Sequence, residues 1–209
     1  MESIQRLYTE GCFDRFGVSN FSCAQFRRLY DCALARGFIL PTVYQSSYSL
    51  AVRGNEAELF PILRGLGVSI QAYSPIAAGF LAKTPENIQQ GKGSWNPKTP
   101  SGALYQHQYN KPSYMKMLRE FCELSKESGI SQTGLAYRWI RYHSFLQGCC
   151  GDEMIIGAAD VDQLAETLGE LDKGALEPWV VDRVEKFWCL IKDDAPVSNF
   201  ESTQQLRRK

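Results

Sequence analysis

Short apolar segments alternate with amphipathic helical segments along the chain, and this alternation restricts the possible folds more than any other feature. Four segments have the length and apolar content of buried strands, namely residues 16–18, 42–45, 68–73 and 154–157. Each is followed by residues with the apolar spacing of a helix. Strands that alternate with helices form parallel sheets through right-handed crossovers. The sequence therefore predicts an α/β protein.

Each predicted strand ends in small or polar residues. These are Ser19, Asn20, Gln45, Tyr73, Ser74 and Gly157. The pattern favours a (β/α) barrel of the TIM type, because such barrels bind ligands at the carboxyl ends of their strands. A doubly wound sheet would have a G-x-G-x-x-G turn after its first strand, and the sequence has no such motif. A closed barrel needs eight strands, so we predict an incomplete barrel of about four βα units.

Capping residues and glycines mark the ends of several predicted helices. Gly11 ends a first helix, and Ser22 is suited to begin a second one that ends near Gly37. Further helices are predicted over residues 56–66, 112–128, 132–143, 161–171 and 178–191. Residues 77–111, rich in Gly, Pro, Asn and Gln, are expected to form an excursion loop without helix or strand, and residues 196–209 a solvated C-terminal tail. Residues 1–209 are interpreted as one partial barrel domain.

The composition excludes several classes of function. The 209 residues include 23 basic and 23 acidic side chains, so there is no net charge to attract nucleic acid or an anionic membrane. The sequence contains neither an apolar run long enough to span a bilayer nor a signal-peptide pattern at Met1. Its seven cysteines lack metal-ligand spacing, and the pair Cys149-Cys150 is interpreted as part of a reduced loop. We therefore expect a cytoplasmic protein without a metal site.

Four phrases of the sequence resemble the aldo-keto reductase family. Residues 10–21, with Gly17-Val18-Ser19-Asn20 inside them, resemble the passage into the fifth barrel strand of that family. Residues 41–45, 72–81 and 155–164 resemble the sixth, seventh and eighth strands. Residues 39–45, 58–67, 138–152 and 176–182 are similar to the aflatoxin-aldehyde (succinic semialdehyde) reductase branch. The resemblance covers about residues 2–200 and implies that the chain is the C-terminal half of such a barrel.

The resemblance implies a nicotinamide cofactor site made of residues at these strand ends. Ser19, Asn20 and Gln45 would bind the carboxamide, and Tyr73 would stack beneath the ring. The loop after Tyr73 would wrap the pyrophosphate, with Ala77 among its small residues. The implied contacts are Ser19, Asn20, Gln45, Tyr73, Ser74, Pro75, Ile76, Ala78, Gly79, Leu81, Gly157, Ala159, Asp160, Gln163 and Thr167. Taken singly, Ser19-Asn20 also fits a turn, Gln45 a residue that satisfies backbone groups, and Tyr73 a core residue.

The resemblance implies NADP(H), but the adenine end of the predicted site departs from the family. Ala159 and Asp160 stand where the related enzymes carry serines, and Glu166 and Thr167 stand where they carry Gln and Asn. A serine can donate to a 2′-phosphate, whereas Asp160 and Glu166 would repel it. An acidic side chain can instead accept from a free ribose hydroxyl, so NAD remains an alternative.

No catalytic residue of the family is assigned within this chain. The family's Asp, Tyr, Lys and His lie on the first four strands, and we expect that region to precede Met1. His107 falls in the predicted excursion loop, and His143 on a helix pattern typical of packing or surface residues. Residues 105–110 lack the arginine-rich phrase of the branch, and Glu201 replaces an expected arginine. These departures argue against a carboxylate-bearing substrate, although the resemblance still implies a small carbonyl compound.

Three interpretations of an incomplete barrel follow from the sequence. The chain is a truncated product of an NADP-dependent aldehyde or ketone reductase, or it pairs with a partner, or it is a non-catalytic nucleotide-binding or interaction module. The possible partners are a second copy in a homodimer or a complementing N-terminal half. Four parallel strands leave two open edges with unpaired backbone groups, which favours some form of pairing.

Overall fold

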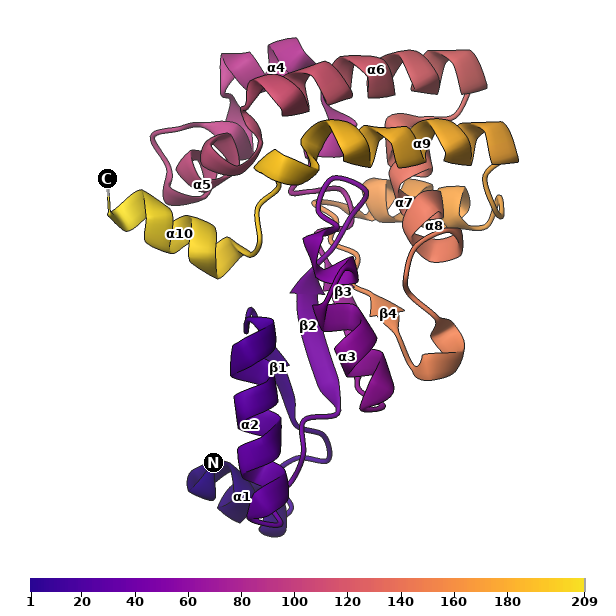
Figure 1. Cartoon of the computed structure of the whole chain (residues 1–209). Coiled ribbons are helices and arrows are strands. Elements are labelled where there is room, and N and C mark those ends of the chain that lie inside the picture. The colour runs from indigo at the N-terminus through magenta and orange to yellow at the C-terminus, as the bar shows by residue number, and fades with distance from the viewer. Residues whose placement is uncertain (209) are drawn as a thin grey trace.

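A four-stranded parallel sheet forms the centre of the molecule. In the computed structural model, which describes residues 1–208, the strands β1 (Gly17–Ser19), β2 (Val43–Ser47), β3 (Ser69–Tyr73) and β4 (Glu153–Met154) are hydrogen-bonded in that order (Figure 1). All three neighbouring pairs are parallel. The α/β class is confirmed, and the sheet is consistent with a partial TIM-like barrel.

Helices precede β1, connect successive strands and follow β4. They are α1 (Glu2–Thr9), α2 (Cys23–Ala35), α3 (Leu59–Gly65), α4 (Pro85–Gln90), α5 (Pro100–Tyr109), α6 (Pro112–Ser128), α7 (Gln132–Tyr142), α8 (Val161–Leu171), α9 (Pro178–Ile191) and α10 (Asn199–Arg207). Ser22 caps α2 as predicted, because its hydroxyl accepts from Gln25 N and the Gln25 side chain accepts from Ser22 N. Within residues 1–208, no helix combines the length and apolarity that crossing a membrane requires.

Two segments have more regular structure than the sequence predicted. The segment 77–111 is not an irregular loop, because it holds α4 and α5. Thr84 and Thr99 cap these helices, and Trp95 is fully buried between them against Phe80. The C-terminal segment likewise forms α10 on α5, where the Gln108 amide donates to Asn199 Oδ1 at 2.9 Å (Lys209 lies outside the described residues). Polar helices of this kind are stabilised by packing and caps that apolar periodicity does not reveal.

The fourth strand is also shorter than predicted. The sequence suggested residues 154–157, but the ladder covers Glu153–Met154 and ends with a bond from Ile155 N to Ala72 O at 2.8 Å. The sheet order gives β4 a neighbour on one side only. A strand with one neighbour forms half the ladder bonds of an inner strand, which explains its shortness.

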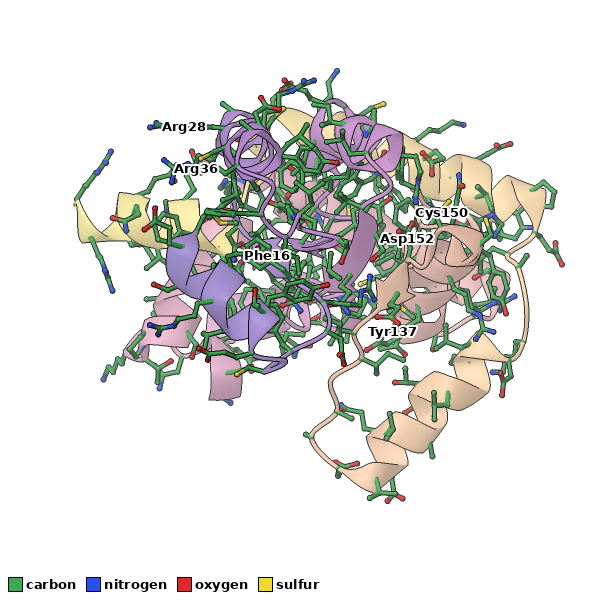
Figure 2. The ribbon with its side chains drawn as sticks, turned by 90° about the horizontal axis from the view of Figure 1, so that it is seen from below. Phe16, Arg28, Arg36, Tyr137, Cys150 and Asp152 are labelled. Atoms are coloured by element: carbon green, nitrogen blue, oxygen red, sulfur yellow. The ribbon has the colours of Figure 1, made fainter. Side chains whose placement is uncertain are left out.

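A buried carboxylate fixes β4 to the rest of the sheet. The Asp152 side chain is fully buried and accepts from the backbone N–H groups of Ile70 and Gln147, each at 2.8 Å. It also pairs with the Arg64 guanidinium, which lies over the Phe145 ring. Figure 2 shows Asp152 close to Cys150 and away from Phe16, which precedes β1. Asp152 therefore joins α3, β3 and the loop before β4.

We expect Asp152→Ala to destabilise the protein by about 3 kcal/mol, because it leaves a guanidinium and two backbone donors without their partner. Chemical denaturation measures this free energy of unfolding. The matched control is Glu123→Ala, which removes a carboxylate from an exposed ion pair with Lys126 and should change the stability by less than about 0.5 kcal/mol. Equal effects of the two substitutions would contradict the role assigned to Asp152.

His143 has a packing role, as the sequence suggested. It follows α7, and its Nε2 accepts a hydrogen bond from Leu176 N at 2.9 Å. Accepting at Nε2 requires the neutral ring. Burial, together with the nearby Arg138 charge, lowers the pKa of His143.

The lowered pKa of His143 predicts a loss of stability in mild acid. Below the ordinary histidine value of 6.5 the unfolded chain takes up a proton that the folded chain resists. The free energy of unfolding should therefore fall as the pH falls from 7.5 to about 5. Denaturation of His143→Asn over the same range should show a smaller decline. An unchanged slope in the variant would show that other groups cause the decline.

Candidate functional site

Three predicted site residues meet at the carboxyl ends of β1 and β3. The Tyr73 hydroxyl donates to Asn20 Oδ1 at 2.9 Å, and Asn20 Nδ2 donates to Ser19 Oγ at 3.0 Å. Asn20 has a φ of 59°, a left-handed conformation that asparagine tolerates better than most residues. The parallel sheet brings these groups to one edge although 53 positions separate Tyr73 from Asn20.

Gln45 belongs to a row of polar side chains that crosses the same face of the sheet. Ser19, Gln45, Gln71 and Glu153 are successive partners in the strand register. Gln45 Nε2 donates to Gln71 Oε1 at 3.3 Å, and Gln71 Nε2 donates to Glu153 Oε2 at 2.8 Å. Gln71 and Glu153 were not predicted as site residues. The sequence contains one sign of this row. Gln71 lies between Ile70 and Ala72, which are buried, so its side chain points to the other face of the strand.

The turn after β3 has an unusual backbone. Ser74, Ala77 and Ala78 have φ values of 56°, 50° and 55°, and Gly79 follows at 82°. Each non-glycine residue in this region costs on the order of 1 kcal/mol, so such residues persist where the surroundings hold them. The surroundings here are the fully buried Phe80 and Leu81 and the Trp95 indole, which donates to Ala78 O at 3.2 Å.

Several backbone groups of this turn are already paired. Ala77 N donates to Ser74 O at 2.8 Å, and Gly79 N donates to Ile76 O at 3.0 Å. Ala77 is fully buried, whereas Ile76, Ala78 and Gly79 are partly exposed. The part of the turn that a ligand could reach is therefore limited to these small or apolar residues.

The residues at the end of β4 divide into two groups. Asp160 caps α8 by accepting from Gln163 N, and Gln163 Oε1 accepts from Ala159 N, both at 2.8 Å. These residues and Gly157 are exposed. Thr167 is not among them, because it is only 6 % exposed and lies beside the Tyr137 hydroxyl between α7 and α8. The structure thus brings four of the five predicted residues to the surface and places Thr167 inside.

The electrostatics of Tyr73 do not suit a proton donor. Burial raises the pKa of Tyr73, and the hydrogen bonds to Ser47 and Asn20 only partly oppose this. A general acid works best when its pKa lies near the operating pH. The raised pKa therefore makes Tyr73 a poor general acid.

A groove that the sequence did not predict adjoins this cluster. It has a volume of about 880 Å³ and lies between Asn20 and Ser47 on one side and the segment around α10 on the other. Phe200 supplies apolar lining, and Glu201 places a carboxylate at the wall. Lys192 and Arg208 also line the groove, so its wall carries both signs of charge. Among residues 1–208, no group of three or more His, Cys, Asp and Glu side chains is arranged to hold a metal ion.

Comparison with known proteins agrees with this geometry. The model of the Aldo/keto reductase family matches residues 1–188. The chain is 40% identical to Oxidoreductase sirO of Leptosphaeria maculans over 94% of its own length and 60% of that protein. It is 33% identical to Aflatoxin B1 aldehyde reductase member 2 of Homo sapiens, over 94% of its own length and 56% of that protein.

The chain thus spans less than two thirds of the length of these relatives. The family match begins at the first residue, and it does not identify which half of a barrel the residues form. On the extent of the match and the identity to these relatives, the chain belongs to the aldo/keto reductase family.

Proposed function

We propose that this chain forms the cofactor-binding part of an NADP-dependent reductase of aldehydes and ketones. The observation that carries the proposal is the convergence of Ser19, Asn20 and Tyr73 at one rim, beside Gln45 and a left-handed turn. The bound dihydronicotinamide supplies the hydride. The protein then has to bind this group, orient it and exclude competing reactions.

The strand-end side chains have the chemistry to orient a nicotinamide ring. A carboxamide has both donors and an acceptor, and the amide and hydroxyl groups of Ser19, Asn20 and Gln45 offer both. The hydrogen bond to Asn20 fixes the orientation of the Tyr73 ring, whose face can support an aromatic group. The turn after β3 would contact the pyrophosphate at Ile76 and Ala78, which are partly exposed.

We further propose that these residues correspond to strands five to eight of the family's barrel. On this view the proton donor belongs to the first four strands. The raised pKa of Tyr73 supports this view, because it makes this phenol a poor general acid. A non-catalytic nucleotide-binding module is the second candidate function, and the raised pKa of Tyr73 favours it as well. In either case we expect a cytoplasmic protein.

The surroundings of Asp160 weaken the preference for NADP. Asp160 already satisfies a donor at the start of α8, and Asp162 and Glu166 add negative charge on the same helix. A 2′-phosphate would have to approach these carboxylates, whereas a free ribose hydroxyl could donate to one of them. We propose NADP(H) as the family cofactor, with NAD(H) as the alternative that Asp160 supports.

Titration of the chain with NADPH, followed by nucleotide fluorescence, tests the proposed cofactor site. We expect Gln45→Ala to raise the dissociation constant by up to about tenfold, since it removes hydrogen bonds worth about 1 kcal/mol. The control is Gln90→Ala, which removes an exposed amide on α4 and should bind like the unmodified chain. Wild-type affinity in Gln45→Ala would refute the carboxamide assignment. Absence of binding by the unmodified chain to both NADPH and NADH would refute the site as a whole.

The proposed absence of a proton donor predicts that the 209 residues alone consume no NADPH with an aromatic aldehyde. The physical reason is that burial raises the pKa of Tyr73, the phenol at this rim, which makes it a poor donor to the carbonyl oxygen. The loss of NADPH absorbance over time, compared with a blank without protein, measures this. Turnover above the blank that Tyr73→Phe abolishes would show that Tyr73 donates the proton after all.

A further inference from the structure

The loop between α7 and β4 carries two neighbouring thiols. Cys149 and Cys150 are both exposed and both free. They end the short 3₁₀ turn Gly148–Cys150, and the Cys150 thiol donates to Gln147 Oε1 at 3.6 Å. The two cysteine side chains also lie close enough to interact with each other. No other two of the seven cysteines are adjacent in the sequence, so this pair differs from the rest.

The loop that carries this pair is closed at its base. Gln147 N donates to Asp152 Oδ2 at 2.8 Å, and Cys150 N donates to Gln147 O at 2.9 Å. Gly151 N donates to Gly148 O at 3.0 Å, which continues the turn past the second cysteine. Asp152 follows the pair by two residues, and Figure 2 shows it close to Cys150. A change in the backbone at the cysteines is therefore transmitted to the carboxylate that anchors β4.

A disulfide between adjacent residues can form, but it is strained. Neighbouring Cα atoms are about 3.8 Å apart across a trans peptide, whereas the Cα atoms of ordinary disulfides are about 4.4 to 6.8 Å apart. Strain of this kind makes a disulfide easier to reduce, and labile disulfides are the ones that serve regulation. Such a bond also closes almost no loop in the unfolded chain, so it adds no stability through chain entropy. Oxidation of the pair should therefore be reversible and should destabilise the folded state.

The surroundings of the pair slow its oxidation but leave it accessible. Desolvation and the hydrogen bond to Cys149 raise the pKa of Cys150, and the charge of Arg64 only partly opposes this. The reactive species is the thiolate, so a raised pKa slows the reaction with an oxidant at neutral pH. The free thiols of the structure are consistent with this. Both cysteines are exposed, so a small oxidant can reach either of them.

We propose that Cys149 and Cys150 form a modification site at which hydrogen peroxide produces a reversible disulfide between them. The thiolate of one cysteine attacks a peroxide oxygen, the O–O bond breaks, and a sulfenic acid and water are formed. The sulfur of the other cysteine attacks the sulfenic sulfur, the S–O bond breaks, and a second water leaves. In total the two thiols lose two electrons and two protons, and the peroxide is reduced to two molecules of water. The strained bond weakens the contact between Gln147 and Asp152 that anchors β4.

Mass spectrometry of the peroxide-treated chain tests the site. Trypsin cleaves after Arg and Lys and so releases residues 142–173 as one peptide, which contains this pair and no other cysteine. After mild treatment with hydrogen peroxide and alkylation under denaturing conditions, we expect this peptide to lack two hydrogen atoms and to carry no alkyl group. Dithiothreitol should restore both alkylation sites. Cys149→Ser and Cys150→Ser should each abolish the bond, whereas Cys32→Ser, at an exposed cysteine of α2, should leave it unchanged.

Urea denaturation tests the coupling to Asp152. The oxidised chain should unfold at a lower urea concentration than the reduced chain, and dithiothreitol should reverse the shift. Peroxide should shift Cys149→Ser less, and that smaller shift measures oxidation elsewhere, such as at Met154.

Two kinds of result would overturn the proposal. Peroxide that leaves both thiols free, carries them to sulfinic acids or joins two chains would show that the pair is not this modification site. A disulfide that leaves the urea midpoint unchanged would show that the pair is not coupled to Asp152. The proposal does not depend on cofactor binding, so its failure would leave the proposed function untouched.

Discussion

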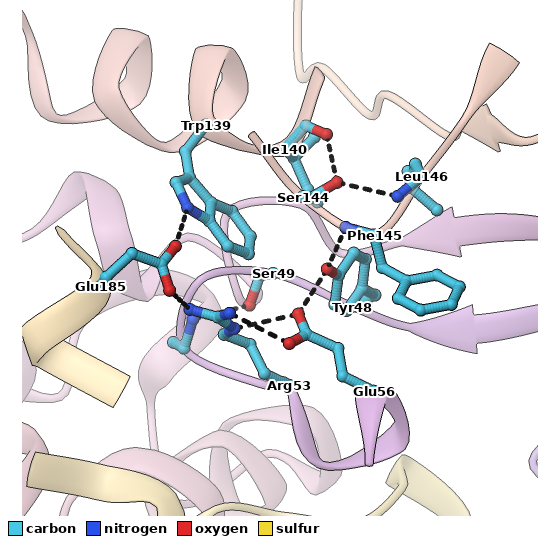
Figure 3. A network of polar contacts seen from close by, with 11 residues as sticks. Tyr48, Ser49, Arg53, Glu56, Trp139, Ile140, Ser144, Phe145, Leu146 and Glu185 are labelled. Atoms are coloured by element: carbon cyan, nitrogen blue, oxygen red, sulfur yellow. Dashed lines mark hydrogen bonds and ion pairs between the residues drawn. The ribbon is translucent and has the colours of Figure 1, made fainter. Parts of the chain in front are cut away.

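The guanidinium of Arg53 joins three parts of the chain that are far apart in the sequence, and the arrangement of the layers depends on it. It binds Glu56 through two nitrogens, at 2.9 and 3.0 Å, and Glu185 at 2.7 Å (Figure 3). It also lies 4.8 Å from the centroid of the Trp139 ring, whose indole donates to Glu185. Burial opposes the charge, but the two carboxylates more than offset this and raise the pKa of Arg53. A buried pair fixes geometry more than it adds stability, and here it fixes the segment after β2 against α7 and α9.

The position of the candidate site follows from this fixed segment. Tyr48 lies three residues beyond Gln45, and its hydroxyl donates to Glu56 and accepts from Phe145 N. The end of β2 is therefore held rigidly, and its neighbour β3 leads directly into the strained turn at Ser74. Strained backbone at a rim of this kind persists only because the surrounding core determines it. The core thus holds the residues of the candidate site in the fixed geometry that binding a small molecule requires.

Much of the fold could be predicted because local signals agreed with it. The periodicity of apolar residues and the caps gave α6, α8 and α9 with their observed bounds. α5 and α10 escaped prediction because their faces are polar. The buried Trp95 and the side-chain hydrogen bonds between α5 and α10 stabilise them. The periodicity of apolar residues reveals neither contact. The strands were found, but their observed bounds differ from the predicted ones by up to three residues, since a strand ends where its partner ends.

The sequence proposed members of the candidate site but not their arrangement. The sequence by itself determined the alternation of strands and helices, the neutral charge, and the family phrases that point to Ser19, Asn20, Gln45 and Tyr73. The tertiary structure alone decided that Tyr73 binds Asn20, that Gln71 and Glu153 extend the row of Gln45, and that Thr167 turns inward. Local preferences act over a few residues, whereas these contacts join positions 26 to 82 residues apart, and only the register of the sheet brings such positions together.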